Sequence, residues 1–567
     1  MKRKLLLLLT LCFLAQWGVA QAPKWVEKAK RAVFSVVTYD QNDKILSTGN
    51  GFFITESGQA LSDYSLFKGA KRAVIINSEG QQMPVESIMG ANDMYDVVKF
   101  KVVINAKKVP ALTVAALAPV VGADVYLLPY STQKNRSYTA GKVKEVDKVS
   151  DNYSYYTLSM QLKDKMVSCP LMTADGQVFG LAQKASGQDT TTICYAVDAR
   201  FADAQTISAL SYSDMALRNI GIKKALPDTE EQALVFLYMA STQVEPDKYA
   251  ELLEDFIAQY PNSADGYLRR AANRLYRSKD EATMDLVMAD LDKAVSTAQK
   301  EDDVYYNRAK MIYSYMLEAP TPVYKDWSYD KALSEVHQAI SVNPLPVYTQ
   351  LEGDIHFAKR DYAAALVCYE KVNQSNLASP ATFFSAAKTK EMMQAPAEEV
   401  LALLDSCVSR FPQPYTTAAA PYLLERAQAR VNADQPRNAV LDYDEYFNIV
   451  NGQVNDMFYY LREQAALKSK QFQRALDDIA KAIELNPKEL TYRAELAVVN
   501  IRVGRSEEAL KVLDEALAID PKYSEAYRLK GIAQLQLKKK SEACASFAKA
   551  KELGDPNVDA LIEKHCK

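Results

Sequence analysis

Three stretches near the C-terminus decide the fold: ALDDIAKAIELNP at residues 475–487, ALKVLDEALAIDP at 509–521 and ACASFAKAKELGDP at 543–556. Each begins with an alanine and carries a second alanine seven residues later, and both alanines recur at a step of 34 residues. This fixed period predicts stacked helical hairpins. Seven residues make about two helical turns, so both alanines lie on one face, where small side chains let helices approach closely. The alanines in register are Ala475, Ala509 and Ala543, followed by Ala482, Ala516 and Ala550.

The pattern resembles the tetratricopeptide repeat family. Gly531 lies 12 residues before Ala543, where the first helix of such a repeat needs a small side chain. Helical periodicity begins near Glu230, and it predicts roughly nine helical pairs in a solenoid at about residues 229–556. Residues 557–567 are expected to form a capping helix, because a terminal repeat must cover its apolar face.

The composition is that of an ordinary multidomain protein. A chain of 567 residues is too long for one core and predicts two or more domains. The 68 lysines and arginines nearly balance the 71 aspartates and glutamates, so charge gives no reason to expect a nucleic-acid partner. The cysteines form no CxxC motif and the three histidines are far apart, so we predict no metal site and no cofactor.

The first 20 residues have the organisation of a signal peptide. Lys2, Arg3 and Lys4 form a basic start, residues 5–14 form an apolar core, and Ala20 ends a small-residue cleavage pattern. A cut after Ala22 is the alternative, but proline would follow it. No later stretch approaches 18 apolar residues, so the sequence predicts no membrane span in the mature chain and an extracytoplasmic location, periplasmic or secreted.

Residues 23–211 have a different texture from the helical region. Short apolar segments rich in β-branched residues alternate with turn sequences such as Glu79-Gly80, which is typical of an all-β barrel or sandwich. About 190 residues would suit two small barrels. The expected strands are 32–38, 51–55, 73–77, 96–103, 123–128, 154–161, 177–183 and 191–197.

Three short motifs in this region follow one another in an order that can be compared with known families. GNGFFI at 49–54 is followed by DVV at 96–98 and by VSCPL at 167–171. This order resembles the trypsin-like serine peptidases, most closely the HtrA-like group. The resemblance implies an all-β double barrel and places Asp96 at the family's aspartate position.

The departures from the family motifs concern the catalytic residues themselves. Ser65 stands where the resemblance implies the histidine, and Val167 stands where it implies the nucleophilic serine. Residues 23–336 contain no histidine that could act as the base. Ser168 or Cys169 could be offered as a shifted nucleophile, but neither has an obvious base. Together with Lys165 in place of a loop glycine, these changes predict an inactivated peptidase domain.

The same resemblance implies a disulfide between Cys169 and Cys194, since it sets their strands side by side. Two free buried thiols are the alternative. A second candidate pair is Cys544 with Cys566, which would join the last repeat to its cap.

A solenoid of this family offers an inner groove lined by the first helix of each pair. That face would suit an extended peptide or a partner helix, although each of its residues could equally be an ordinary solvated position. The Lys/Asn pattern that clamps a C-terminal carboxylate is missing, because Thr491 and Glu495 occupy candidate positions. The predicted groove residues are Tyr460, Gln464, Leu467, Lys468, Val498, Ile501, Arg502, Arg528, Ile532 and Leu535.

The sequence thus predicts an inactivated trypsin-like domain at 23–211, a linker at 212–228 and the repeat solenoid. Two functions follow. One is an exported, non-catalytic adaptor that binds a protein or peptide through its repeats. The other is a secreted serine endopeptidase whose repeats recruit substrate. The sequence does not identify the partner or the oligomeric state.

Overall fold

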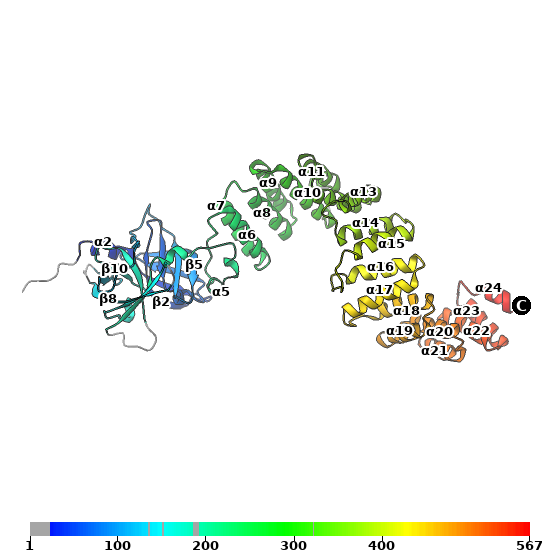
Figure 1. The fold of residues 1–567 in the computed structure, drawn as a ribbon. Helices are drawn as coiled ribbons and strands as arrows, with labels where there is room; N and C mark the ends of the chain where they lie inside the picture. The colour runs from blue at the N-terminus through cyan, green and yellow to red at the C-terminus, as the bar shows by residue number, and fades with distance from the viewer. Residues whose placement is uncertain (1–22, 134–136, 150–151, 185–191, 321, 567) are drawn as a thin grey trace, which may run out of the picture. The chain divides into compact units, whose positions relative to one another are not determined.

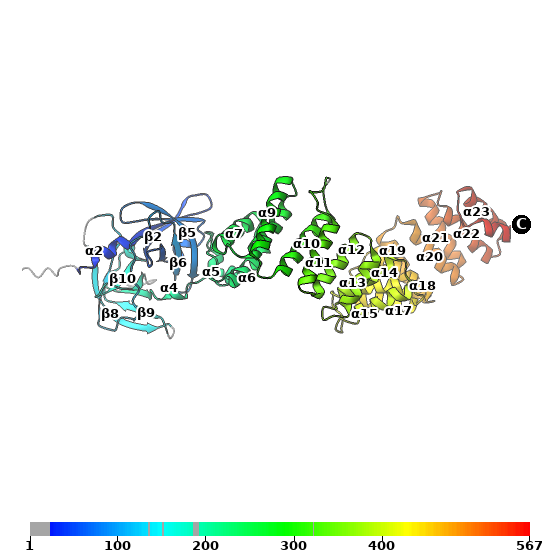
Figure 2. The ribbon, with the colours of Figure 1, turned by 90° about the horizontal axis from the view of Figure 1, so that it is seen from above.

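The computed structural model describes residues 23–133, 137–149, 152–184, 192–320 and 322–566. The predicted signal peptide lies outside the described residues. The chain divides into two compact units, Met1–Ala298 and Gln299–Lys567. Figures 1 and 2 show that the strands belong to the first unit and that helices make up the second.

Two closed antiparallel barrels open the first unit (Figure 1). The first has the strand order β1-β2-β3-β6-β5-β4, and the second has the order β10-β11-β12-β9-β8-β7. The predicted all-β double barrel is therefore confirmed. The first barrel comprises β1 (Val33–Tyr39), β2 (Ile45–Phe53), β3 (Gln59–Ser62), β4 (Arg72–Ile76), β5 (Gln82–Asn92) and β6 (Val97–Val102). The second comprises β7 (Asp124–Leu127), β8 (Thr139–Lys148), β9 (Ser154–Leu158), β10 (Pro170–Thr173), β11 (Val178–Gln183) and β12 (Cys194–Asp198).

Neighbouring side chains on the strands of the first barrel enter two different cores. Phe34 and Phe53 pack inside the first barrel, whereas Val33 and Phe52 join the core of the second barrel. A strand that is buried on both faces reads as a continuous apolar run, as GFFI does. Gly51 lies in this crowded layer, where a Cβ atom would come within 2.6 Å of both the Leu61 carbonyl oxygen and the Phe34 ring.

Short helices and turns complete the barrel region and lead into the repeats. The chain at 212–228, predicted as a linker, lies against the first barrel: the Ile88 N–H donates to the Lys223 carbonyl, and the Ala225 N–H donates to the Ile88 carbonyl. One core includes Phe34 of the barrel and Phe236 of the first long helix, so barrel and first helical pair pack as one body. The short elements are α2 (Val26–Ala29), η1 (Lys30–Ala32), α3 (Tyr64–Phe67), η2 (Asp164–Met166), α4 (Phe201–Ala204), η3 (Ser211–Ser213) and α5 (Met215–Arg218).

Long helices then follow one another in pairs. The first unit ends with α6 (Glu230–Ser241), α7 (Pro246–Gln259), α8 (Ala264–Arg277) and α9 (Glu281–Thr297). The second unit begins with α10 (Glu301–Leu317), α11 (Tyr329–Val342), α12 (Pro346–Ala358), α13 (Tyr362–Asn373), α14 (Pro380–Met392), α15 (Ala397–Val408), α16 (Ala420–Asn432) and α17 (Pro436–Ile449). It continues with α18 (Asp456–Lys468), α19 (Phe472–Leu485), α20 (Leu490–Arg502), α21 (Ser506–Ile519), α22 (Ser524–Gln536), α23 (Lys540–Glu552) and α24 (Asp559–His565). In the described part of the chain, α6 to α23 make nine pairs, as predicted.

The predicted 34-residue register matches the packing. All six alanines that defined it are fully buried. Gly531 of α22 faces the Phe547 ring of α23, so that a Cβ atom at residue 531 would lie 2.6 Å from Phe547 Cδ1. After the last pair, a disulfide joins Cys544 of α23 to Cys566, which follows α24. The last helix is thus tied to the repeat that it covers.

Buried arginine–aspartate pairs join the two helices of several repeats. Arg462 of α18 holds Asp478 of α19 at 2.7 Å, and Arg426 of α16 holds Asp442 of α17 at 2.7 Å. Both pairs are 16 residues apart in sequence. Buried charges need such partners because their desolvation is costly.

Candidate functional site

Two of the three residues at the family's catalytic positions touch. Ser65 lies in α3, and Asp96 directly precedes β6. The Ser65 N–H donates to Asp96 Oδ1 at 2.6 Å, and its hydroxyl donates to Oδ2 at 3.0 Å. The barrel therefore brings the predicted histidine and aspartate positions together, but here the aspartate holds a serine.

The nucleophile position lies on a tight turn formed by η2. Val167 ends this turn, and its N–H donates back to the Asp164 carbonyl at 3.4 Å. The Met166 N–H likewise donates to the Lys163 carbonyl at 2.8 Å. An isopropyl side chain offers no nucleophilic atom, and these two N–H groups are used within the turn rather than turned toward a substrate oxygen.

An asparagine from the first barrel braces the same turn. Asn50 Nδ2 donates to the carbonyl of Lys165 at 3.1 Å and to the carbonyl of Val167 at 2.8 Å. The Ser62 hydroxyl donates to the backbone carbonyl of Asn50 at 2.6 Å, so the brace is itself held from β3. The sequence predicted no structural role for Asn50, which appeared there only as part of the motif GNGFFI.

A buried carboxyl group completes the centre. The Ser168 hydroxyl donates to Asp63 Oδ2 at 2.6 Å, while Asp63 Oδ1 has no hydrogen-bond partner among the described residues. Burial, and then the neighbouring Asp96, raise the pKa of Asp63 to about 8. Ser168 has a left-handed backbone with φ of 62° and is 1% exposed. Its hydroxyl is thus enclosed rather than presented to a substrate.

The expected disulfide between Cys169 and Cys194 is wrong. Both residues are buried free thiols. β11 lies between β10 and β12, so the two cysteines come from strands that do not pair. Two strand spacings amount to about 9–10 Å, beyond the Cα separation that a disulfide spans. Burial raises the pKa of each thiol to about 12, which leaves Cys169 without nucleophilic thiolate.

Two family models each match a part of the chain. Residues 49–181 match the trypsin-like peptidase domain, and residues 466–561 match the tetratricopeptide repeat. The chain carries a trypsin-like domain followed by tetratricopeptide repeats. The repeats support a role in protein–protein interaction.

Similar proteins are related to this chain over part of their length. The small glutamine-rich tetratricopeptide repeat-containing protein 2 of Mycosarcoma maydis is 31% identical over 96 residues, 17% of this chain and 27% of that protein. The TPR repeat-containing protein MJ1428 of Methanocaldococcus jannaschii is 21% identical over 194 residues, 34% of each chain. The chain therefore spans about a third or less of these relatives. Among solved structures, the active form of the Rv3671c protease from M. tuberculosis matches at 20% identity and a TM-score of 0.28, covering 32% of this chain and 82% of that one.

The predicted groove residues lie on α18, α20 and α22, but they differ in what they present. Tyr460 packs its ring 5.4 Å from that of Tyr492, and both rings lie on the first helices of neighbouring repeats. Arg528 is engaged by Asp555 at 3.0 Å and by Glu525 at 2.5 Å. Ile501 is 9% exposed and packs in the core between repeats, so its assignment to the groove is wrong. The half-buried members are Leu467, Val498, Ile532 and Leu535, and the exposed ones are Lys468 and Arg502.

One fully buried acidic residue on these helices was not predicted from the sequence. Glu463 of α18 is fully buried, and burial together with Glu495 raises its pKa to about 8. The 34-residue register could have revealed it, because the same position holds Ala497 and Gly531 in the next two repeats. A glutamate aligned with two small residues predicts a carboxyl group forced into a helix contact.

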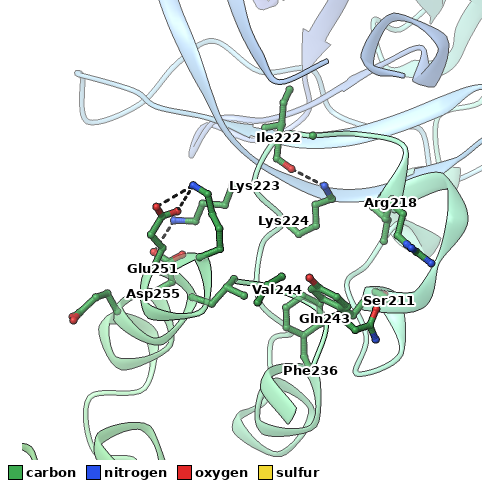
Figure 3. Close-up of a pocket in the computed structure, with 16 residues that line it drawn as sticks. Ser211, Arg218, Ile222, Lys223, Lys224, Phe236, Gln243, Val244, Glu251 and Asp255 are labelled. Carbon is green, nitrogen blue, oxygen red and sulfur yellow. Dashed lines mark hydrogen bonds and ion pairs between the residues drawn. The ribbon is translucent and has the colours of Figure 1, made fainter. Parts of the chain in front are cut away.

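A cavity of about 720 Å³ lies where the first helical pair meets residues 211–224 (Figure 3). Lys223 pairs with Asp255 at 2.6 Å, and Lys248 pairs with Glu251 at 3.0 Å. Lys224 donates to the Ile222 carbonyl at 2.7 Å, and burial lowers its pKa to about 8. Since the lysines of this cavity are already engaged, we regard it as part of the packing between barrel and repeats.

In the described part of the chain, no helix combines the length and hydrophobicity that crossing a membrane requires. Within the same residues, no three acidic, histidine or cysteine side chains come together as metal ligands.

Proposed function

We propose that this protein is a non-catalytic adaptor that binds a protein or peptide partner through its tetratricopeptide repeats. The observation that carries the proposal is the turn at the nucleophile position. It bears Val167, and its N–H groups and carbonyls are bonded within the turn and to Asn50. A serine mechanism needs a nucleophile, a base and free N–H donors at this place.

The proposal includes an extracytoplasmic location. The signal-peptide pattern at residues 1–20 supports export. The disulfide between Cys544 and Cys566 also supports it, because such bonds persist mainly in oxidising compartments.

A fluorophosphonate probe tests the catalytic half of the proposal. The purified protein should label no more than a heat-denatured control, because Ser65 is bound to Asp96 and Ser168 is enclosed. Labelling that disappears when one serine in residues 23–211 is changed to alanine would support the endopeptidase alternative instead.

Affinity capture from the native envelope, read by mass spectrometry, tests the binding half. The expected partner co-elutes with the parent chain and is lost from Tyr460→Ala, which alters the inner face of α18. It is retained by Lys481→Ala, whose exposed side chain lies on α19. Equal recovery from both variants would contradict binding through this face.

A further inference from the structure

Two carboxyl groups on neighbouring first helices of the repeats lack a cation. Glu463 of α18 accepts a hydrogen bond from Gln464 Nε2 through Oε2 at 2.7 Å, and its Oε1 has no partner. Glu495 lies on α20, where burial raises its pKa and the nearby Gln464 amide acts in the opposite direction. Throughout the described ranges, neither glutamate forms an ion pair with a lysine or arginine. Among these residues, the one hydrogen bond to this pair of acidic groups is thus the one that Gln464 donates to Glu463.

Two other buried carboxylates in this unit do have such partners. Asp478 of α19 is held by Arg462, and Asp555 is held by Arg528. Enclosing a carboxylate without a cation is costly, so two of them side by side mark a place that a positive group would stabilise. The charged groups facing them are Asp478, Glu525 and Arg502, of which only Arg502 attracts, and it is exposed.

An aromatic ring borders the two glutamates. Tyr460 of α18 lies one helical turn from Glu463 and feels the charges of Glu495, Glu463 and Glu525. A tyrosine face beside carboxylates suits an ammonium or guanidinium group, which can pack on the ring while donating to the oxygens. Tyr460 and Gln464 were predicted groove residues, so this site lies on the face already proposed for binding.

We propose that this acidic site, formed by Tyr460, Glu463, Gln464 and Glu495, binds a lysine or arginine side chain of the partner protein. The inference rests on the proposed adaptor function and adds the chemistry of its ligand. The cation donates to the half-buried Glu495 and acts on the enclosed Glu463 through its charge, while its aliphatic stem packs on Tyr460. Glu495 stands at a position where a carboxylate clamp would need a basic or amide group, so the site selects the opposite charge.

Cation binding should release a proton. At pH 7 the Glu463 carboxyl is protonated, because its pKa lies at about 8. An adjacent positive charge favours the ionised form and lowers that pKa, so the proton leaves as the ligand arrives. The released proton gives a readout that Glu463→Gln should remove.

A peptide array tests the choice of ligand. The full chain is applied to 12-residue peptides of varied sequence, and the retained peptides should share lysine or arginine at one position. Replacing that residue by norleucine should weaken binding roughly tenfold or more. Glu495→Gln should weaken binding to a similar extent, whereas Glu508→Gln, an exposed glutamate on α21, should leave it unchanged.

Calorimetry with the best retained peptide tests the site directly. Titrations at pH 7 in buffers of different ionisation enthalpy should report release of up to about one proton per peptide. Glu463→Gln, checked for folding by circular dichroism, should abolish this release. A release that survives in Glu463→Gln would overturn the assignment. Glu463→Ala, which introduces the residue that the next repeat has at this position, provides the same test if the glutamine variant does not fold.

The outcomes separate this inference from the adaptor function. Retained peptides without a shared basic residue, or binding that Glu495→Gln leaves intact, would reject the acidic site while leaving the adaptor proposal standing. No retained peptide at all, together with no partner lost from Tyr460→Ala in the capture experiment, would reject both.

Discussion

The centre around Ser65, Asp96 and Val167 and the C-terminal repeat face each contain a buried carboxyl group whose pKa is raised to about 8. Asp63 and Glu463 also each carry one oxygen without a hydrogen-bond partner in the described part of the chain. Their surroundings differ. Asp63 accepts a hydrogen bond from the Ser168 hydroxyl inside a braced turn, whereas Glu463 accepts one from the Gln464 amide and has the half-buried Glu495 as its acidic neighbour. The first group is enclosed by the fold, and the second lies next to the face proposed for binding.

This difference shows what an unpaired buried acid can indicate. The two pKa shifts have the same direction and the same main cause, burial, so they do not distinguish structure from function. The distinction comes from the acidic residue that neighbours each buried carboxyl group. At Asp63 that neighbour, Asp96, is occupied by Ser65, while at Glu463 it is a carboxylate with no cation of its own.

The largest expected effect in the repeats comes from creating another buried acid without a cation. Arg462→Met removes the cation from Asp478, which is 4% exposed, and should cost about 3–5 kcal/mol of unfolding free energy. Denaturant unfolding followed by circular dichroism measures it. Lys481→Met is the matched control, because its pair with Glu484 is exposed and the variant should unfold like the parent. If Arg462→Met also unfolds like the parent, a buried acid in these repeats needs no cation. The contrast between Asp63 and Glu463 would then fail.

Much of the fold could be predicted because its pattern is local. The 34-residue period locates the alanines that the helices bury, and strands buried on both faces, such as β1, appear as apolar runs. β8 was missed because it is mostly exposed and its sequence, TAGKVKEVDK, has few apolar residues. Only its pairing with β7 and β9 makes it a strand.

The next effect tests the register itself. Ala509→Leu places a larger side chain at a fully buried helix contact and should cost about 1–3 kcal/mol through overpacking. Thermal melting of the full chain measures the loss, with Ala518→Leu, an outward-facing residue of the same helix, as its control. Equal melting temperatures for Ala509→Leu and the parent would show that the assigned register is wrong.

A pH-dependent effect separates Asp63 from ordinary carboxylates. The folded state holds a proton on Asp63 up to about pH 8, whereas the unfolded chain loses it near pH 4. Stability must therefore fall as pH rises between these values. Asp63→Asn cannot ionise, so it should match the parent at pH 4 and exceed it progressively as pH rises to about 8, by about 1.4 kcal/mol for each pKa unit of the shift.

Melting curves of parent and variant from pH 4 to pH 9 measure this difference. Asp147→Asn, at an exposed aspartate in β8, is the control and should show no such trend. A gain for Asp63→Asn that is independent of pH would contradict a protonated Asp63.

The candidate sites depended on contacts that the sequence does not place. The family motifs located Ser65 and Asp96, which do touch, but they gave no sign that Asn50 would bond to the turn at Val167. Asn50 and Val167 are 117 residues apart and meet only because two barrels pack together. The disulfide expectation failed for a related reason, since adjacency in a barrel depends on strand order rather than on sequence order.

Restoring the two missing catalytic side chains should produce no peptidase activity, and this expectation tests most directly whether the centre is closed. Ser65→His with Val167→Ser restores a base next to Asp96 and a hydroxyl at the nucleophile position. The backbone does not change with them: the N–H at residue 167 still donates to the Asp164 carbonyl, and Asn50 still holds the carbonyls at residues 165 and 167. With the N–H at residue 167 engaged, the oxyanion of a tetrahedral intermediate loses one donor, which costs roughly 10²–10³-fold. The double variant should therefore cleave a fluorogenic peptide library no faster than the parent.

Adding Asn50→Ala releases the brace, so activity that appears only in this triple variant would show that the turn, and not the missing side chains alone, keeps the centre inactive. Activity in the double variant itself would mean that the centre is less closed than Asp63 and its neighbours indicate.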